Sequence, residues 1–205
     1  MSSPRSSAPA IPERGKLLVI AGPSGVGKGT VVRRLLGRLP DLYLSVSVTT
    51  RRPRPAERDG LDYVFVSDGR FDEMIASGEL LEWAQVFGHR SGTPAAPVEA
   101  ALSAGRDAIL EIDVQGAEQV RKAAPQALLV FLAPPSMEEL ERRLRTRGTE
   151  DEAKVARRLA KAEEEMGQQG WFDHVVVNDD AERASTEVAA IIIGSHDSSE
   201  GSAHP

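Results

Sequence analysis

The chain contains no cysteine, few aromatic residues and no long apolar run, and each absence excludes a class of function. Without cysteine, neither a disulfide bond nor a thiolate metal site can form. No stretch approaches the roughly 20 apolar residues of a transmembrane helix, and the opening MSSPRSSAPAIPE lacks the apolar segment of a signal peptide. We therefore expect a cytoplasmic protein that does not bind membranes.

Positive charge is also scarce over the chain as a whole. The net charge is −6, which disfavours general attraction to nucleic acids or membranes. Aromatic residues make up 4% of the sequence, so few rings are present on which bases could stack. The arginines are bunched within 51–58 and 142–158. This distribution leaves room for local positive sites on an acidic chain.

A length of 205 residues suits one domain with a smaller insert. We expect residues 1–15 to form a disordered leader and residues 195–205 a disordered tail. Between them, strand and helix patterns alternate. The expected strands are 16–21, 45–48, 62–66, 80–86, 108–112, 128–132 and 175–177. The expected helices are 31–39, 70–76, 98–104, 117–122, 136–145, 152–168 and 181–193.

This alternation predicts an α/β fold, with a parallel sheet covered by helices on both faces. The core would comprise residues 16–44 and 96–194. The segment from about 45 to 95 holds three closely spaced strands and few helical residues. It therefore predicts a small, mostly antiparallel insert that projects from the sheet.

The stretch AGPSGVGKGT follows the apolar run LLVI and fits the phosphate-loop pattern G-x-x-x-x-G-K. A strand, a glycine-rich turn and a helix in this order direct backbone N–H groups and a helix N-terminus towards phosphates. The alternative is a simple glycine-rich turn with an exposed lysine. The flanking strand and helix favour a nucleotide-phosphate site, which the resemblance described below assigns to ATP. Its residues would be Gly22, Pro23, Ser24, Gly25, Val26, Gly27, Lys28, Gly29 and Thr30.

The loop departs from its pattern at Gly29, where serine or threonine usually supplies a hydroxyl to Mg²⁺. Thr30 still offers a hydroxyl one position later. We expect phosphate binding to persist and the metal to be held mainly through water.

The segment SVSVTTRRPRPAERDGLDY carries the candidate acceptor site. Arg51 and Arg54 lie on a proline-broken loop and could grip a phosphate bidentately, with Tyr63 as a third donor. The alternatives are a solvated basic loop and a nucleic-acid patch. The acidic chain disfavours the second alternative.

The segment ELLEWAQ contains Glu82. Its carboxylate could accept hydrogen bonds from both N1–H and the exocyclic amine of guanine, a pairing that adenine cannot offer. Taken alone, a glutamate in a strand is more often a surface charge. The hypothesis gains weight only beside the two phosphate-binding segments.

Together, eight ordered motifs resemble the guanylate kinase family. They are the phosphate loop, SVSVTTRRPRP, DGLDYVFV, GELLEWAQ, ILEIDVQGA, VFLAPPS, RLRTRGTED and VVVNDD, spanning about residues 16–194. The resemblance implies a phosphate-loop core, a GMP-binding insert and a helical lid at about 140–165. It also implies transfer of phosphate from ATP to GMP with Mg²⁺, and dGMP as a second acceptor.

The resemblance also assigns the site residues. Arg51, Arg54 and Tyr63 would bind the GMP phosphate; Ser47, Glu82 and Thr93 would read guanine. Asp113 would lie near the base and near the metal, which Thr30 and Asp113 would reach through water. The catalytic charges would be Lys28, Arg54, Arg143, Arg147 and Arg158, and Asn178 and Asp179 would contact ATP.

One further departure and two alternatives remain. Ser91 stands where many family members have a tyrosine that contacts the acceptor phosphate, and His89 or Arg90 could compensate. The GKGT ending leaves a kinase for another nucleoside monophosphate open, and a non-catalytic guanylate-kinase-like binding module is the second alternative. The sequence is compatible with a monomer or a small homo-oligomer.

Overall fold

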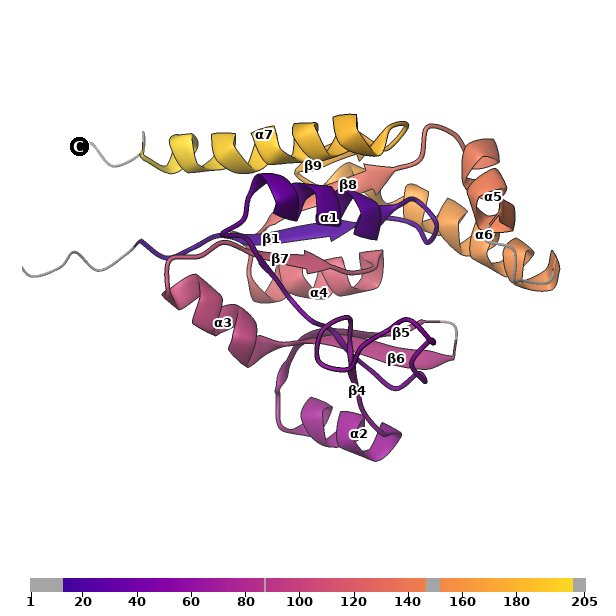
Figure 1. Cartoon of the computed structure of the whole chain (residues 1–205), viewed down its shortest axis with the longest axis horizontal. Helices are drawn as coiled ribbons and strands as arrows, with labels where there is room; N and C mark the ends of the chain where they lie inside the picture. The colour runs from indigo at the N-terminus through magenta and orange to yellow at the C-terminus, as the bar shows by residue number, and fades with distance from the viewer. Residues whose placement is uncertain (1–12, 87, 147–151, 201–205) are drawn as a thin grey trace, which may run out of the picture.

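The core of the molecule is a five-stranded parallel sheet (Figure 1). The computed structural model describes residues 13–86, 88–146 and 152–200. The strand order is β2-β7-β1-β8-β9. The bounds are Tyr43–Leu44 for β2, Ala108–Glu111 for β7, Leu17–Ala21 for β1, Leu128–Ala133 for β8 and His174–Val177 for β9.

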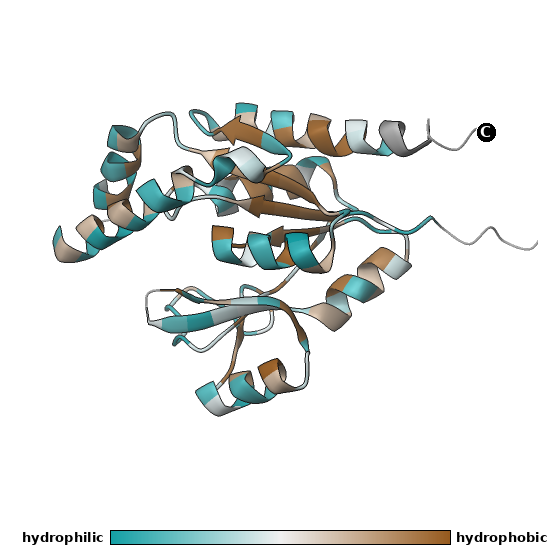
Figure 2. Cartoon of the chain, turned by 180° about the vertical axis from the view of Figure 1, so that it is seen from behind, coloured by the Kyte–Doolittle hydropathy of each residue, from teal (hydrophilic) through white to brown (hydrophobic). Residues whose placement is uncertain are grey.

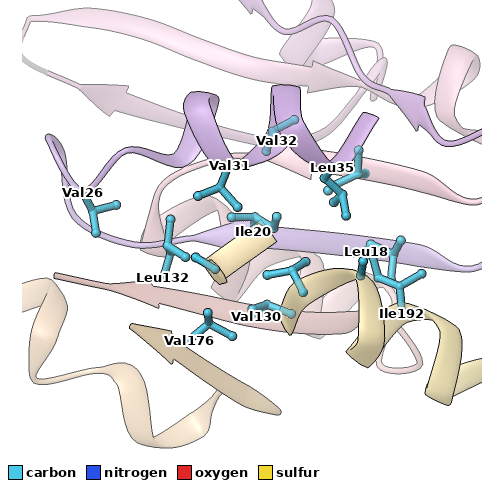
Figure 3. Packing of buried hydrophobic residues seen from close by; sticks show 14 of the residues in the cluster. Leu18, Ile20, Val26, Val31, Val32, Leu35, Val130, Leu132, Val176 and Ile192 are labelled. Carbon is cyan, nitrogen blue, oxygen red and sulfur yellow. The ribbon is translucent and has the colours of Figure 1, made fainter. Parts of the chain in front are cut away.

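Helices cover both faces of this sheet, which confirms the fold class expected from the sequence. One face packs against α1 (Lys28–Arg38) and α7 (Ala181–Glu200), with Val31, Leu35 and Ile192 in the buried cluster (Figure 3). The other face packs against α3 (Ala95–Ser103) and α4 (Val114–Ala123). All five residues of β1 are buried, as expected for a strand with both faces covered. Figure 2 shows the apolar strands between helices that carry both hydrophilic and hydrophobic residues.

The insert forms a second sheet with the order β4-β3-β6-β5. These strands are β3 (Val48–Thr49), β4 (Val64–Phe65), β5 (Leu80–Val86) and β6 (His89–Pro94). Two of its three pairings are antiparallel, as expected. The expected strands did not include β6, and the sequence pattern placed this strand in a loop region. It also began the insert's helix two residues late, because α2 spans Asp68–Ala76 and Ser67 caps it by accepting from Arg70 N.

Two helices form the candidate lid at the side of the core (Figure 1). They are α5 (Met137–Thr146) and α6 (Glu152–Met166), followed by the short helix η1 (Gln169–Trp171). Leu140, Leu144 and Val155 are buried in the same cluster as α1. The lid helices are therefore anchored to the core at their apolar faces.

Both ends of the described chain are more ordered than expected. The disordered tail is a wrong prediction for residues 195–200, because α7 continues to Glu200. Lys16 Nζ donates to Ser195 O, and His196 Nε2 lies 2.7 Å from Asp107 Oδ2. At the other end, Gly15 N donates to Leu102 O at 2.9 Å. Residues 1–12 and 201–205 lie outside the described ranges.

Within those ranges, no helix has both the length and the apolar character that a membrane span requires.

Candidate active site

The loop between β1 and α1 has a phosphate-binding shape. Gly22, Gly25 and Gly27 have φ values of 145°, 91° and 100°, which side chains rarely tolerate. A Cβ at Gly22 would lie 2.2 Å from Leu132 O, and one at Gly27 would lie 2.7 Å from Asn178 Nδ2. The first turn of α1 carries no acidic residue. The helix N-terminus therefore adds partial positive charge to the backbone N–H groups of the loop.

Lys28 folds back over this loop. Its Nζ donates to Gly22 O at 2.6 Å and to Pro23 O at 3.3 Å. Burial lowers the pKa of the ammonium, while the negative charges of Glu111, Glu165 and Asp113 act in the opposite direction. The two carbonyl contacts hold the ammonium against the start of the phosphate loop.

Glu111 is a site residue that the sequence analysis missed. It ends β7, which pairs directly with β1, and its carboxylate faces Gly29. A Cβ added at Gly29 would lie 3.3 Å from Glu111 Oε2. Burial raises the pKa of Glu111, with Lys28 and Arg33 opposing. A carboxylate directly after the buried run AIL, beside the phosphate-loop strand, was the available signal.

A second group of charges joins the lid to the core beside the loop. Asp113 caps α4 by accepting from Gly116 N at 2.9 Å. Lys161 Nζ, on α6, lies 3.5 Å from Asp113 Oδ2 and 3.6 Å from Glu165 Oε1. Burial raises the pKa of Glu165, and Lys161 is the largest opposing influence. Lys161 thus lies within ion-pair distance of one carboxylate on the core, Asp113, and one on the lid, Glu165.

The oxygen atoms near Lys28 fit Mg²⁺, which prefers hard oxygen ligands and retains several waters. The electrostatic influence of Glu111 and Asp113 on Lys28 indicates that both carboxylates lie near it. Thr30 follows one residue after Gly29 in α1. No group of three or more acidic or imidazole side chains suited to a metal occurs among the described residues.

The candidate guanine site is a buried pair in the insert. Glu82 on β5 and Thr93 on β6 face each other across the sheet, and Thr93 Oγ1 donates to Glu82 Oε1 at 2.7 Å. Glu82 is 4% exposed and Thr93 0%. Burial raises the pKa of Glu82 to about 7. A Cβ at Gly116 would lie 2.4 Å from Glu82 Oε2, so this glycine lets the carboxylate approach the first turn of α4. Ser47 is half-buried just before β3.

The arginine loop contains an ion pair that the sequence analysis did not foresee. Arg51 Nη1 and Nη2 each donate to Glu57 at 2.6 Å. The guanidinium lies over the ring of Tyr63, 4.6 Å from its centroid. Arg54 is different, because its side chain is 75% exposed and lies 3.8 Å from Glu57. The structure therefore brings Arg51 and Tyr63 together and leaves Arg54 extended into solvent.

Ser91, which stands where many family members have a tyrosine, and its neighbour Arg90 both make contacts within the insert. Ser91 Oγ donates to Val48 O at 3.2 Å. Arg90 donates to Asp68 at 2.9 Å and to Asp72, and it lies over the ring of Phe71 at 4.9 Å. Arg90 therefore fastens β6 to α2, and compensation at the acceptor phosphate by Arg90 is not supported.

Lid arginines reach the phosphate loop directly. Arg158 Nη2 donates to Ser24 Oγ at 2.7 Å, and Arg143 donates to Val26 O at 3.2 Å. Arg143 also donates to Asn178 O at 3.0 Å. Arg147 lies outside the described residues. The two described arginines thus contact the phosphate loop itself.

Asn178 supports the loop from behind. Asn178 is 4% exposed, and its Nδ2 donates to Val26 O at 2.7 Å. Asp179 is exposed instead and pairs with Arg183 at 2.7 Å. Hydrogen bonding from Arg183 lowers the pKa of Asp179. Asn178 therefore has a visible role in fixing the shape of the phosphate loop, whereas Asp179 stabilises the start of α7.

A surface hollow of about 820 Å³ lies elsewhere, at the amino-terminal ends of β1 and β8. Leu17, Val98 and Arg121 are among its lining residues. It contains none of the candidate residues, and no phosphate-binding loop opens onto it. Because ligands of open parallel sheets bind beyond the carboxyl ends of the strands, we assign the site to the opposite edge.

A parallel sheet whose first strand leads into a lysine-bearing phosphate loop defines a phosphate-loop nucleotide-binding protein. The lid arginines that contact the loop are typical of the kinases in this class. The family model described as guanylate kinase matches residues 14–194, and the chain belongs to the guanylate kinase family.

Similar proteins agree with this membership. A guanylate kinase from Corynebacterium diphtheriae is 54% identical over 182 residues, covering 88% of this chain and 95% of the relative. One from Parasynechococcus marenigrum is 54% identical over 178 residues, covering 87% and 98%. The crystal structure of guanylate kinase from Anaplasma phagocytophilum aligns with a TM-score of 0.75 at 34% identity, covering 90% of this chain and 87% of that one.

Proposed function

We propose that the chain is a guanylate kinase that transfers the γ-phosphate of ATP to GMP, producing ADP and GDP, and that it also accepts dGMP. One observation carries the choice of acceptor: Glu82, a buried carboxylate, is held by Thr93 beside the first turn of α4. Guanine offers two adjacent N–H donors to such a group. The relatives at 54% identity bear the same name.

On the donor side, the backbone N–H groups of residues 22–30 bind the ATP phosphates, and Lys28 neutralises the outer ones. Mg²⁺ bound with ATP supplies further charge neutralisation. Thr30, Asp113 and Glu111 are the residues that would hold it, through water. Asn178 holds the loop at Val26, and we place it and Asp179 on the nucleotide side of the site.

On the acceptor side, Arg51, Arg54 and Tyr63 bind the GMP phosphate and aim one of its oxygens at the donor. Glu82 accepts from N1–H and the exocyclic amine of guanine, and Ser47 and Thr93 line the base edge. Glu82 must be ionised to accept both of these hydrogen bonds from guanine. The two guanine donors therefore lower a pKa that burial has raised to about 7.

The lid completes the site. Arg143, Arg147 and Arg158 neutralise the transferring group and exclude water, which would otherwise hydrolyse ATP. Contacts from Arg143 and Arg158 to the phosphate loop support this role. No general base is needed, because the acceptor phosphate is already an anion. We place the reaction in purine nucleotide metabolism in the cytoplasm, carried out by a monomer or a small homo-oligomer without a nucleic-acid or membrane partner.

An acceptor screen tests this proposal. ADP release from Mg-ATP is followed with GMP, dGMP, AMP, CMP and UMP. We expect GMP to be the best acceptor, dGMP the second, and the other three to be poorer by orders of magnitude. Preference for AMP, CMP or UMP would support a kinase for another nucleoside monophosphate. Binding of GMP without any turnover would support the non-catalytic module.

A further inference from the structure

Glu57 is a charged residue of the arginine loop to which the proposed reaction gives no role. It lies in the segment PAERDG, three residues after Arg54 and six before Tyr63. Its side chain is 16% exposed and that of Arg51 is 17% exposed. The two side chains therefore form a largely covered ion pair on a loop that otherwise faces solvent.

The contacts of Glu57 fix two parts of the loop at once. Its Oε1 and Oε2 accept from Nη2 and Nη1 of Arg51, both at 2.6 Å. Oε2 also accepts from the backbone N–H of Arg54 at 2.8 Å, and Glu57 N donates to Arg54 O at 3.0 Å. Hydrogen bonding from Arg51 lowers the pKa of Glu57 to about 2. The carboxylate is thus ionised at every pH at which the enzyme would work.

The geometry leaves Arg51 able to bind a second anion. A guanidinium carries five N–H groups. Two of them donate to Glu57 and one donates to Arg52 O at 3.1 Å, and the Tyr63 hydroxyl is a further hydrogen-bonding neighbour of the guanidinium. Because Nη1 supplies two of these three, the remaining two N–H groups belong to Nε and Nη2, which share one edge of the plane. That edge is a fork of the kind that binds a phosphate bidentately.

Aromatic rings hold the plane of the same guanidinium. Its carbon Cζ lies 4.6 Å from the centroid of Tyr63 and 5.6 Å from that of Phe65. Glu57 therefore binds one end of the Arg51 guanidinium, and the aromatic rings pack near its plane. An arginine on a flexible loop loses conformational freedom when it binds a ligand, and a guanidinium held in this way has lost most of it beforehand.

We propose that Glu57 is a positioning residue for the acceptor: it orients Arg51 before GMP arrives, so that the free edge of the guanidinium meets the phosphate. The inference rests on the proposed function, in which Arg51 binds the GMP phosphate. Glu57 acts through Arg51 and does not itself touch GMP. Its effect should therefore depend on the phosphate and not on the base.

The test measures binding of GMP and of guanosine by calorimetry to wild type and to Glu57→Gln, Arg51→Ala and the double variant. We expect Glu57→Gln to weaken GMP binding about tenfold, the factor expected for ordering one arginine side chain. Guanosine binding should change by less than about twofold, since guanosine has no phosphate. In the Arg51→Ala background, Glu57→Gln should have no further effect on GMP binding.

Two controls accompany these variants. Glu73→Gln removes the same charge from the same insert, at an exposed residue paired with Arg70 at 3.3 Å, and should leave GMP binding unchanged. Glu57→Asp keeps the charge but shortens the side chain, and should lose less affinity than Glu57→Gln. Thermal unfolding of each variant shows that the loop change leaves the core folded.

Three results would overturn the inference. Unchanged or tighter GMP binding in Glu57→Gln would mean that Glu57 does not orient Arg51, or competes with the phosphate for it. Equal weakening of GMP and guanosine would give Glu57 a purely structural role in the loop. If Arg51→Ala leaves GMP binding unchanged, the proposed phosphate site is wrong, and the inference about Glu57 is wrong with it. If Arg51→Ala weakens GMP binding but Glu57→Gln does not, only the inference about Glu57 is wrong.

Discussion

Gly29 in the phosphate loop faces the carboxylate of Glu111, and a Cβ at position 29 would lie 3.3 Å from Oε2 and 3.4 Å from Oε1. A side chain at position 29 would therefore press on Glu111. Position 29, where a serine is usual, is thus directly beside the glutamate that ends β7. The positive charge of Lys28 acts to lower the pKa of Glu111, which burial raises, so this carboxylate also interacts with the lysine of the loop.

Gly29→Ser and Gly29→Ala form a matched pair that separates crowding from metal binding. Both variants add a Cβ beside Glu111, but only serine adds an oxygen that Mg²⁺ accepts as a ligand. We expect Gly29→Ser to need less free Mg²⁺ for half-maximal rate than Gly29→Ala, at fixed ATP. The measurement is a Mg²⁺ titration of the rate for wild type and both variants. Identical titrations for the two variants would mean that the missing hydroxyl does not limit metal binding.

Glu82 should give the enzyme a pH dependence on its acidic side. Its pKa of about 7 in the free protein means that GMP must bind to a carboxyl that is partly protonated at neutral pH. We expect kcat/KM for GMP to fall as the pH drops below about 7. The second ionisation of a phosphate, near about 6, adds a separate decline, and Glu82→Gln should retain only that one. Glu79→Gln, an exposed glutamate paired with Arg70, serves as the control and should keep the wild-type profile.

The same raised pKa has a consequence for stability. A carboxyl with a higher pKa in the folded than in the unfolded protein favours folding most below its unfolded value, near 4.5. This contribution is lost as the pH rises through about 7. The unliganded Glu82→Gln variant should therefore gain stability relative to wild type between pH 5 and pH 8, as measured by urea unfolding. A constant difference across this range would argue against a raised pKa.

Arg158 should matter for turnover more than for binding. Its contact with Ser24 joins the lid to the phosphate loop, and a charge that neutralises a transferring phosphate is worth about 10³-fold or more in rate. We expect Arg158→Ala to lower kcat by about that factor and to release more ADP per GDP formed, because water enters the site. Arg157→Ala, at the exposed neighbouring position, should retain both values. Loss of GMP affinity with unchanged kcat would contradict the lid role.

The end of α7 should stabilise the protein. A chain ending at Gly194 loses the bond between Lys16 and Ser195 and the contact between His196 and Asp107. At about 1 kcal/mol for each partly exposed bond, we expect a Tm lower by roughly 4 °C. A chain ending at Glu200 should melt like the full-length protein. Equal Tm values for both truncations would restore the disordered tail that the sequence suggested.

The parts of the site that follow from local sequence could be predicted. The phosphate loop depends on glycines at fixed spacing between a strand and a helix, and the parallel sheet follows from the alternation of strands and helices. Arg51 and Glu82 were proposed from short motifs, and their roles stay predictions. In both cases the residue types and their spacing contain the signal.

The parts that depend on distant partners could not be predicted. Arg90 was a candidate for phosphate binding, yet it is held by Asp68 and Asp72 on α2. Glu111 becomes significant only because β7 pairs with β1. The polar segment SHDSSE reads as a tail, but contacts with Lys16 and Asp107 extend α7 through it. Pairing between residues far apart in sequence decided each of these outcomes.

The most direct test of the central claim is to follow the phosphorus spectrum of a mixture of Mg-ATP and GMP with wild type and with Lys28→Ala. We expect wild type to form ADP and GDP in equal amounts, and only when GMP is present. Loss of the Lys28 ammonium from the phosphate loop should slow this transfer by about 10²–10³-fold or more in a protein that remains folded. Near-normal GDP formation by Lys28→Ala, or ADP formation by wild type without GDP, would contradict phosphoryl transfer to GMP at this loop.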